Sequence, residues 1–378
     1  MELILKQYDI PLLRFSATND SSTPEIEVHW INEDQKHLLP LDMELSPEGI
    51  SRWMRRRTIP RNRAYVNRLL AKCGLNANRP MGILALCKGL SVDDSYWVVE
   101  EGFEGTFEKY NLFENRFSEV LALIAFTGYG SSNRSSLASS PEFTTNGMLP
   151  KCWRRISGKV TLYKGGTDGG YNTGAEPYCE YYAAQVAAAM GIDAIPYGLS
   201  QWKGRLCSTC ELFTDIDHAY MPIGNLVQRG GFDAVAAYYE KLGEPFQKAF
   251  RDMLVFDAVI CNADRHYGNF GFMIDNKTNT IAAPAPLFDH GNSLFNQTGP
   301  EDYESPEAFQ QYIDTLVPCV YDDFFATAKR FMTDENREQL RKLLGFRFKR
   351  HVRYNLPPKR LKLMEEQVRK RATRLLEN

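Results

Sequence analysis

Apolar residues along the chain change from a strand-like to a helix-like spacing near its middle. Within the first 45 residues, short apolar runs at Leu3–Leu5, Leu12–Phe15 and Ile26–Val28 alternate with polar positions, which predicts a hairpin followed by a further strand. A polar loop is expected at 19–22. From about residue 230 onward the spacing is almost wholly helical, apart from the region 262–295. The chain therefore begins rich in strands and ends rich in helices.

Start and stop signals divide the chain further. Ser46 followed by Pro47 reads as a helix start, with the serine as cap. A Gly/Ser-rich connector at 128–132 separates two parts of the strand-rich half. The remaining elements are listed here: helices at 64–73, 113–127 and 177–190, strands at 96–99, 150–156, 158–164 and 206–213, and a last amphipathic helix with Leu361, Met364, Val368 and Leu375 on one side. We expect an α+β fold in three segments: 1–95, 96–215 and 216–378.

The composition is that of an ordinary globular protein. Of 378 residues, 43% are hydrophobic and 24% charged. No run approaches the roughly 18 apolar residues that a membrane span needs, and the N-terminus shows no secretory signal. The eight cysteines are scattered, which is typical of reduced thiols. We expect a cytoplasmic protein without a membrane partner.

The net charge of −2 hides two basic blocks. Between Glu48 and Asp93 there is no acidic residue, and ten basic ones occur: Arg52, Arg55, Arg56, Arg57, Arg61, Arg63, Arg68, Lys72, Arg79 and Lys88. Nine more lie between Glu338 and Glu365. Such blocks bind nucleic acid or an acidic partner, or they are faces paired with acids from elsewhere in the chain. We favour pairing, and keep nucleic-acid binding by 49–92 as an alternative.

Three oxygen-bearing side chains gather on two short turns that each follow an apolar run. Asp264 and Asn269 lie in Asn262–Gly271, and Asp289 in Leu287–Gly291. Phosphoryl transfer from ATP requires one carboxylate near the attacking hydroxyl, and an Asn and an Asp to hold Mg²⁺. The order and spacing indicate a kinase. His266 either assists proton transfer or holds the loop by hydrogen bonding, and we favour the second role.

Upstream elements supply the remaining groups of such a site. Lys164 shares the apolar face of a strand with Val160 and Leu162. A lysine there is costly unless an anion meets it, and ATP phosphates or a helix carboxylate would do so. Glu180 opens the next helix and is the expected partner. The alternative is that Lys164 is a surface lysine at the end of a strand, without a functional role.

Two further segments are candidates for nucleotide contacts. Gly147, in the turn 144–151, allows close backbone approach to phosphate, and the hydroxyls of Thr144 and Thr145 can add donors. By itself such a turn is more often a simple hairpin. Glu211 and Phe213 end a later strand, where backbone groups and a stacking side chain can meet adenine.

The segment from Thr144 to Leu294 resembles the HipA-like family of bacterial Ser/Thr kinases, which are distantly similar to phosphoinositide kinases. The resemblance rests on the loops at 262–271 and 288–294 and on the turn 144–151. It implies Asp264 as catalytic base, Asn269 and Asp289 as Mg²⁺ ligands, Lys164 on the ATP phosphates and Glu180 as its helix glutamate. Thr144 stands where some members carry an autophosphorylated Ser. The basic N-terminal segment departs from the family pattern.

These observations predict a two-lobed protein-kinase-like fold with an extra N-terminal α/β segment. The expected activity is ATP- and Mg²⁺-dependent phosphorylation of a protein Ser or Thr, with autophosphorylation as a hypothesis. A lipid or small-molecule kinase with the same chemistry is the alternative. The resemblance also implies, as a further expectation, that a small regulatory or antitoxin-like protein binds the kinase.

Overall fold

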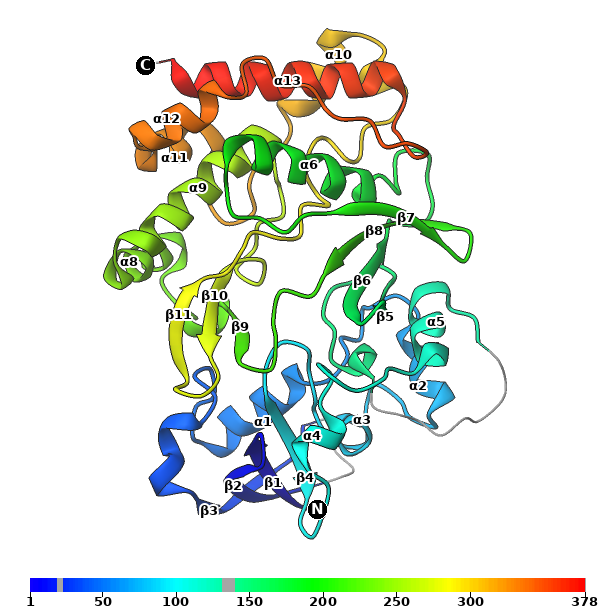
Figure 1. The fold of residues 1–378 in the computed structure, drawn as a ribbon, viewed down its shortest axis with the longest axis vertical. Helices are drawn as coiled ribbons and strands as arrows, with labels where there is room; N and C mark the ends of the chain where they lie inside the picture. The colour runs from blue at the N-terminus through cyan, green and yellow to red at the C-terminus, as the bar shows by residue number, and fades with distance from the viewer. Residues whose placement is uncertain (19–22, 131–139, 378) are drawn as a thin grey trace. The chain divides into compact units, whose positions relative to one another are not determined.

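The computed structural model describes residues 1–18, 23–130 and 140–377 (Figure 1). They form two compact units, each assembled from separate stretches of chain. Unit 1 consists of Met1–Lys164, Glu211–Met221 and Met273–Ala282, and unit 2 of Gly165–Cys210, Pro222–Phe272 and Ala283–Asn378. The division into three segments along the sequence stays a prediction. The predicted polar loop at 19–22 and residues 131–132 of the predicted connector lie outside the described residues.

The N-terminal part of unit 1 is an antiparallel sheet of order β3-β2-β1-β4. Its strands are β1 (Glu2–Gln7), β2 (Ile10–Ala17), β3 (Ile26–Ile31) and β4 (Tyr96–Glu100). Alternating positions of β1 are buried, and Leu5 lies opposite both Leu13 and Val98. The alternation in the sequence therefore predicted the hairpin of β1 and β2 correctly, because one face of the sheet is covered. β4 is instead buried at four successive positions and was predicted as an apolar run after a turn.

Buried residues from the helices at 33–38, 47–56 and 80–87 complete the core of this sheet. Unit 1 contains these three and other short helices. They are η1 (Glu33–Leu38), α1 (Pro47–Arg56), α2 (Val66–Lys72), α3 (Pro80–Cys87), α4 (Phe107–Tyr110), α5 (Glu119–Thr127) and η2 (Pro141–Phe143). The Ser46 hydroxyl accepts the Gly49 amide at 3.1 Å, which confirms the predicted cap. The helix expected over 113–127 begins only at Glu119, because Ser118 caps it there.

Two further β structures complete unit 1. β5 (Lys151–Ile156) and β6 (Lys159–Gly165) form an antiparallel hairpin in which Lys151 lies opposite Lys164, as the strand predictions required. The small sheet of order β11-β10-β9 consists of β9 (His218–Pro222), β10 (Gly271–Asp275) and β11 (Thr280–Pro284), whose residues belong mainly to this unit.

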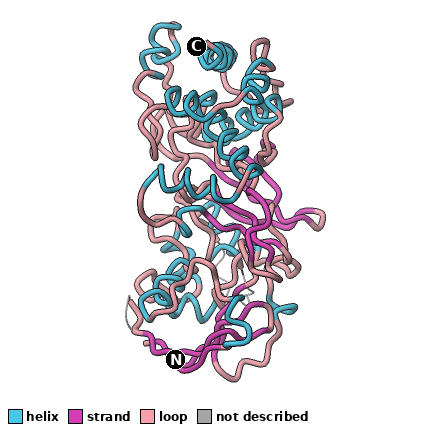
Figure 2. Tube along the Cα trace, turned by 90° about the vertical axis from the view of Figure 1, so that its left-hand side faces the viewer, coloured by secondary structure: helices cyan, strands magenta, loops and turns pink. Residues whose placement is uncertain are grey.

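Unit 2 is mostly helical. One hairpin, β7 (Gly198–Trp202) with β8 (Arg205–Glu211), accompanies the helices. The helices are α6 (Glu176–Met190), α7 (Ile223–Leu226), α8 (Gly231–Leu242), α9 (Glu244–Ile260), η3 (Glu301–Tyr303), α10 (Pro306–Ile313), α11 (Phe324–Phe331), α12 (Asp334–Arg341) and α13 (Pro358–Leu376). Figure 2 shows helices around the C-terminus and strands at the N-terminus. The α+β class is confirmed.

Helix α9 is the centre of unit 2. It packs against α8, α11 and α13, and its second half, from Phe250 onward, is buried almost without interruption. The predicted stripe of α13, from Leu361 to Leu375, faces inward as expected. None of the helices in the described ranges combines the length and apolarity needed to cross a bilayer.

Candidate active site

The predicted catalytic loop begins where helix α9 ends. Cys261 adopts a left-handed φ of 53°, which terminates the helix and turns the chain into the loop. On the last turn of the helix the Asp257 carboxylate is fully buried, and it accepts a hydrogen bond from the Asn262 side-chain amide at 3.1 Å. The buried Asp257 carboxylate, on the last turn of α9, thus lies next to the first residues of the loop.

Arg265 is the partner of this buried acid. Its Nε and Nη2 donate to the two carboxylate oxygens of Asp257 at 2.9 and 3.0 Å, and both side chains are shielded from solvent. Burial by itself would lower the pKa of Arg265, but the charge and hydrogen bonds of Asp257 outweigh it and raise that pKa above its ordinary value. The guanidinium is therefore a fixed cation.

The same guanidinium joins the predicted catalytic and metal-binding loops. Its Nη1 donates to the backbone carbonyl of Asn269 at 3.2 Å and to that of Phe288 at 2.5 Å. Its Nη2 lies 3.0 Å from His290 Nδ1, and that nitrogen must be the acceptor, because a guanidinium can only donate. Asn269 and the residue before Asp289 are consequently held by a single nitrogen.

Hydrogen bonds inside the catalytic loop orient its functional groups. The Asn269 side-chain nitrogen donates to the Asp264 carbonyl at 3.2 Å, which directs its amide oxygen the other way. The Asp264 side chain is exposed, as a group that meets a substrate hydroxyl must be. His266 Nδ1 accepts the Gly268 amide at 3.0 Å. Such a bond is compatible with the loop-holding role that we favoured for His266, which stays a prediction.

The metal-binding loop adopts an uncommon backbone conformation at its aspartate. Asp289 has a φ of 55°, and its amide donates to the buried Tyr197 hydroxyl at 3.0 Å. Burial, followed by the nearby Glu180 charge, raises the pKa of Tyr197 well above its usual range, so this hydroxyl stays protonated. The loop is thus fixed by partners outside itself.

The oxygen atoms of Asp289 and Asn269 suit Mg²⁺, which proteins hold through few side chains, better than a metal that needs a full set of protein ligands. Carboxylate and amide oxygens such as those of Asp289 and Asn269 are ligands that Mg²⁺ prefers, and it usually takes few of them, together with substrate phosphates. No group of three or more His, Cys, Asp or Glu side chains arranged to hold a metal occurs within the described ranges.

Helix α6 presents two buried glutamates to the metal-binding loop. A Cβ added at Gly291 would lie 3.2 Å from Glu176 Cβ, which is a tight contact, and 3.6 Å from Glu180 Oε1, which is an ordinary one. Glu180 is fully buried and accepts the Ser208 hydroxyl. Its predicted ion pair with Lys164 would join residues of the two units, and it stays a prediction.

Lys164 lies in unit 1 and is also buried, with 6% of its surface exposed. It occupies the register position opposite Lys151, which is equally buried. The Lys151 ammonium points to the turn before the hairpin, where it donates to the Asn146 carbonyl at 2.9 Å. The contact of Lys164 with ATP phosphates stays a prediction.

The predicted phosphate loop is a tight turn that precedes this hairpin. Gly147 has a φ of 90°, and Lys151 Nζ donates to the Asn146 carbonyl at 2.9 Å. The hydroxyls are already in use: Thr144 donates to Leu90 at 2.8 Å and Thr145 to Pro141 at 2.7 Å. In this conformation, backbone groups rather than these hydroxyls are the available donors.

The predicted adenine segment follows β8. The Leu212 amide donates to the Val160 carbonyl at 2.9 Å, and the exposed Glu211 carboxylate forms an ion pair with Lys159 at 2.7 Å. Leu212 therefore cannot offer its N–H to a base in this conformation. Adenine contacts at Glu211 and Phe213 stay a prediction.

Acids from outside it neutralise much of the first basic block. Arg56 pairs with Asp42 at 2.8 Å and Arg57 with Asp94 at 2.6 Å, and the pair of Arg63 with Glu142 at 2.5 Å is completely buried. The favoured interpretation, pairing with acids elsewhere in the chain, is thereby confirmed for these residues. These three pairs tie the block to other segments of unit 1.

The second basic block behaves differently. In unit 2, the loop 346–356 exposes Arg347, Lys349, Arg350 and Arg353, and none of these four forms an ion pair within the part of the chain that the structure describes. The loop backbone is well fixed: Gln185 bonds both the amide and the carbonyl of Lys349. This is an ordered, unneutralised cationic surface.

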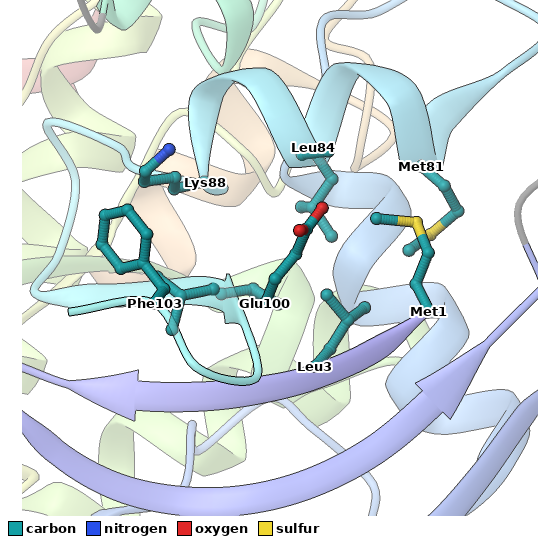
Figure 3. A pocket seen from close by; sticks show the side chains of 10 residues that line it. Met1, Leu3, Met81, Leu84, Lys88, Glu100 and Phe103 are labelled. Atoms are coloured by element: carbon teal, nitrogen blue, oxygen red, sulfur yellow. The ribbon is translucent and has the colours of Figure 1, made fainter. Parts of the chain in front are cut away.

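A pocket in unit 1 lies among the N-terminal elements (Figure 3). Its walls include Met1, Leu3, Met81 and Leu84, with Lys88 and Glu100 as its charged residues. The Lys88 ammonium lies over an aromatic ring of the same wall, that of Phe103, at 4.9 Å. No predicted site residue lines this pocket, so it is not the expected nucleotide site.

Comparison with known proteins supports a kinase relationship. The sequence matches no protein-family model. Over 134 residues it is 26% identical to the serine/threonine-protein kinase CtkA of Helicobacter pylori, a match covering 32% of this chain and 41% of that protein. The match thus spans less than half the length of this relative.

Two solved structures are similar to the chain. HipA of Shewanella oneidensis, solved with HipB and operator DNA, aligns over 98% of this chain and 97% of its own, with a TM-score of 0.53 at 13% identity. The crystal structure of Helicobacter pylori CtkA aligns over 61% of this chain and 90% of its own, with a TM-score of 0.49 at 15% identity.

Sequence reasoning found the motif residues but missed the groups that hold them. Asp257 and Tyr197 were not predicted, although a lone acid in the apolar end of α9 is a signal that could have been used. Asp264, Arg265 and Asn269 lie as one loop on α9, and Asp289 is tied to it through Phe288. The chain therefore has a kinase-like fold of the HipA type, and its sequence is similar to the Ser/Thr kinase CtkA.

Proposed function

We propose that this protein is an ATP- and Mg²⁺-dependent kinase that phosphorylates Ser or Thr of a protein substrate. The observation that carries the proposal is Arg265, whose Nη1 bonds the carbonyls of Asn269 and Phe288 while Asp264 stays exposed in the same loop. Sequence similarity to CtkA supports it over part of the chain. We also propose that the protein acts in the cytoplasm.

Each residue has a distinct role in this proposal. Asp264 orients the acceptor hydroxyl and takes its proton late in the transfer. Asn269 and Asp289 would hold Mg²⁺, which neutralises developing phosphate charge when bound. Lys164 binds the ATP phosphates, and Glu180 positions it. His266 fixes the loop through its bond to the Gly268 amide.

The nucleotide would be held by backbone groups. The turn with Gly147 approaches the phosphates, flanked by Thr144 and Thr145, and the chain at Glu211 and Phe213 meets adenine. Autophosphorylation at Thr144 is part of the proposal, and it requires the turn to open first. Thr144 is buried in the structure, with 4% of its surface exposed, and its hydroxyl donates to the Leu90 carbonyl.

The decisive test is transfer of label from γ-labelled ATP in the presence of Mg²⁺. Wild type is compared with Asp264→Ala and Asp289→Ala, and with Asp233→Ala as a control, because Asp233 is an exposed aspartate on α8. We expect transfer by wild type and the control only, with all four proteins equally folded by circular dichroism. Turnover retained by either site variant would refute its assigned role.

The acceptor distinguishes the leading proposal from its alternative. A lipid or small-molecule kinase would use the same Asp264 chemistry. Label on added protein, or on the chain itself, supports a protein kinase. Label confined to lipid head groups or small alcohols, with none on protein, would favour the alternative.

We also propose that the cationic loop 346–356 contacts an anionic partner. Its four exposed cations, Arg347, Lys349, Arg350 and Arg353, have no acid opposite them among the described residues. The neighbouring HipA structure contains HipB and operator DNA, so a labelled DNA duplex is the first probe. Replacing all four by Ala should remove salt-dependent binding, and Arg55→Ala with Arg61→Ala is the control. Absence of duplex binding at low salt would exclude nucleic acid and direct the search to an acidic or antitoxin-like protein.

A further inference from the structure

We propose that Arg63, in the N-terminal basic block, is a positioning residue that holds the candidate phosphate loop in shape. The inference rests on the proposed function for its catalytic consequence and on the structure alone for its mechanical one. It assigns to the N-terminal segment a role in the nucleotide site.

The Arg63 guanidinium bonds the chain on both sides of the loop. Its Nη1 donates to the Glu142 carbonyl at 2.8 Å and to the Thr145 carbonyl at 3.2 Å, before Gly147. Its Nη2 donates to the Lys151 carbonyl at 2.8 Å, after Gly147. One planar group therefore closes the base of the loop.

A buried carboxylate fixes the guanidinium in this position. Glu142 Oε2 accepts from Arg63 Nη2 at 2.5 Å, and its Oε1 accepts the Trp153 amide of strand β5 at 2.8 Å. Both side chains of the pair are inaccessible to solvent. A second tie lies beside it, since the Ala64 amide donates to the Met148 carbonyl at 2.8 Å.

The geometry requires arginine rather than a generic cation. Arginine presents several N–H groups in a rigid fork, whereas lysine is a point charge on a flexible stem. Four acceptors on two chain segments surround Arg63. A lysine keeps the charge beside Glu142 but cannot reach all of them, so the loop would lose part of its support.

The loop that Arg63 holds is also the loop whose shape matters for phosphate. Gly147 has a left-handed φ of 90°, and a Cβ there would lie 2.2 Å from Lys151 Nζ. Misplacement of a binding group by about 1 Å can cost on the order of 100-fold in rate. Small loosening at the base is therefore expected to be measurable at the nucleotide.

Two variants and a matched control test the proposal. Arg63→Lys and Arg63→Met are compared with Arg61→Met, whose arginine is exposed two residues away. We expect the Arg63 variants to raise the KM for ATP between about 10- and 100-fold, with a smaller change in kcat and the smaller defect for lysine. The control should match wild type.

A measurement without nucleotide separates this proposal from the proposed function. Amide exchange of 144–149, followed by mass spectrometry, should accelerate in both Arg63 variants and not in Arg61→Met. Should Arg63→Met fail to fold, Glu142→Gln serves instead, because it presents an N–H to Arg63 while keeping an acceptor for Trp153. Wild-type exchange in folded Arg63 variants would overturn the proposal. Faster exchange in a protein that binds no ATP would uphold Arg63 as a loop support and refute the kinase.

Discussion

Removal of the Arg265 guanidinium is the most direct test of the geometry that unites the two loops. Arg265→Met removes bonds to Asp257, Asn269, Phe288 and His290. It leaves the fully buried Asp257 carboxylate with the Asn262 amide as its remaining side-chain donor given by the structure. Breaking a buried ion pair by removing one partner costs about 3–5 kcal/mol. We expect a loss of that size in the free energy of unfolding.

Substitution of the partner, Asp257, allows the coupling energy of the ion pair to be measured. Asp257→Asn leaves the Arg265 cation buried without its counter-ion, so it should cost about as much, roughly 3–5 kcal/mol. The double variant has neither charge and should lose clearly less than the sum of the two single losses. The difference is the coupling energy of the pair. Urea unfolding followed by circular dichroism, with midpoints and slopes compared, gives all four values.

An exposed ion pair provides the matched control. Lys159 and Glu211 lie 2.7 Å apart, but their side chains are 65% and 60% exposed. Lys159→Met should therefore cost at most about 1 kcal/mol. If Arg265→Met or Asp257→Asn were as mild as this control, or if their losses simply added, the argument from burial would be wrong. Phosphoryl transfer should fall in both single variants and not in the control.

Three further changes test other parts of the structure. Burial and the neighbouring Asp94 charge raise the pKa of Asp93 to about 6, so between about pH 4 and 6 the folded state holds a proton that the unfolded chain has lost. The wild-type free energy of unfolding should thus fall as pH rises through this range, and the fall should be smaller in Asp93→Asn, as urea midpoints at several pH values would show. Ser46→Ala removes the cap of α1 and should cost about 1 kcal/mol by the same assay. Gly291→Ala should lower kcat while changing the melting temperature little, because its Cβ would press on Glu176, on the helix that also carries Glu180; unchanged turnover would contradict this.

The elements predicted correctly are those whose signals are local. Alternation predicted β1, and an apolar run after a turn predicted β4. The predicted helix start at Ser46 is confirmed because its hydroxyl accepts the Gly49 amide. Helix α6 begins at Glu176, one residue before its predicted start. Helix α3 was missed because Pro80–Cys87 is apolar almost throughout and has no period to read. The strand β7 was missed because Gly198–Trp202 has only one buried residue, Leu199.

In the candidate site, too, the residues that were predicted are those with a local signal in the sequence. Asp264, Asn269 and Asp289 were recognisable because their spacing is a property of short loops. Arg265 gave no such signal of its importance, because it acts through Asp257, eight positions earlier, and Phe288, 23 positions later. Which polar group meets which across that distance follows from how α9 and the loops pack. A single sequence does not contain that information in any local pattern.

The two basic blocks show why composition cannot assign a function to charge. Both are long stretches without an acid, yet in the first block Arg57 and Arg63 meet acids 37 and 79 positions away, while the cations of the loop 346–356 stay exposed. A buried cation is retained only where paired and bonded. Arg63 satisfies that condition by bonding the candidate phosphate loop on both sides. For Arg63, pairing and bonding within unit 1 explain the buried charge, whereas the exposed cations of the loop 346–356 in unit 2 are where we propose to seek an anionic partner.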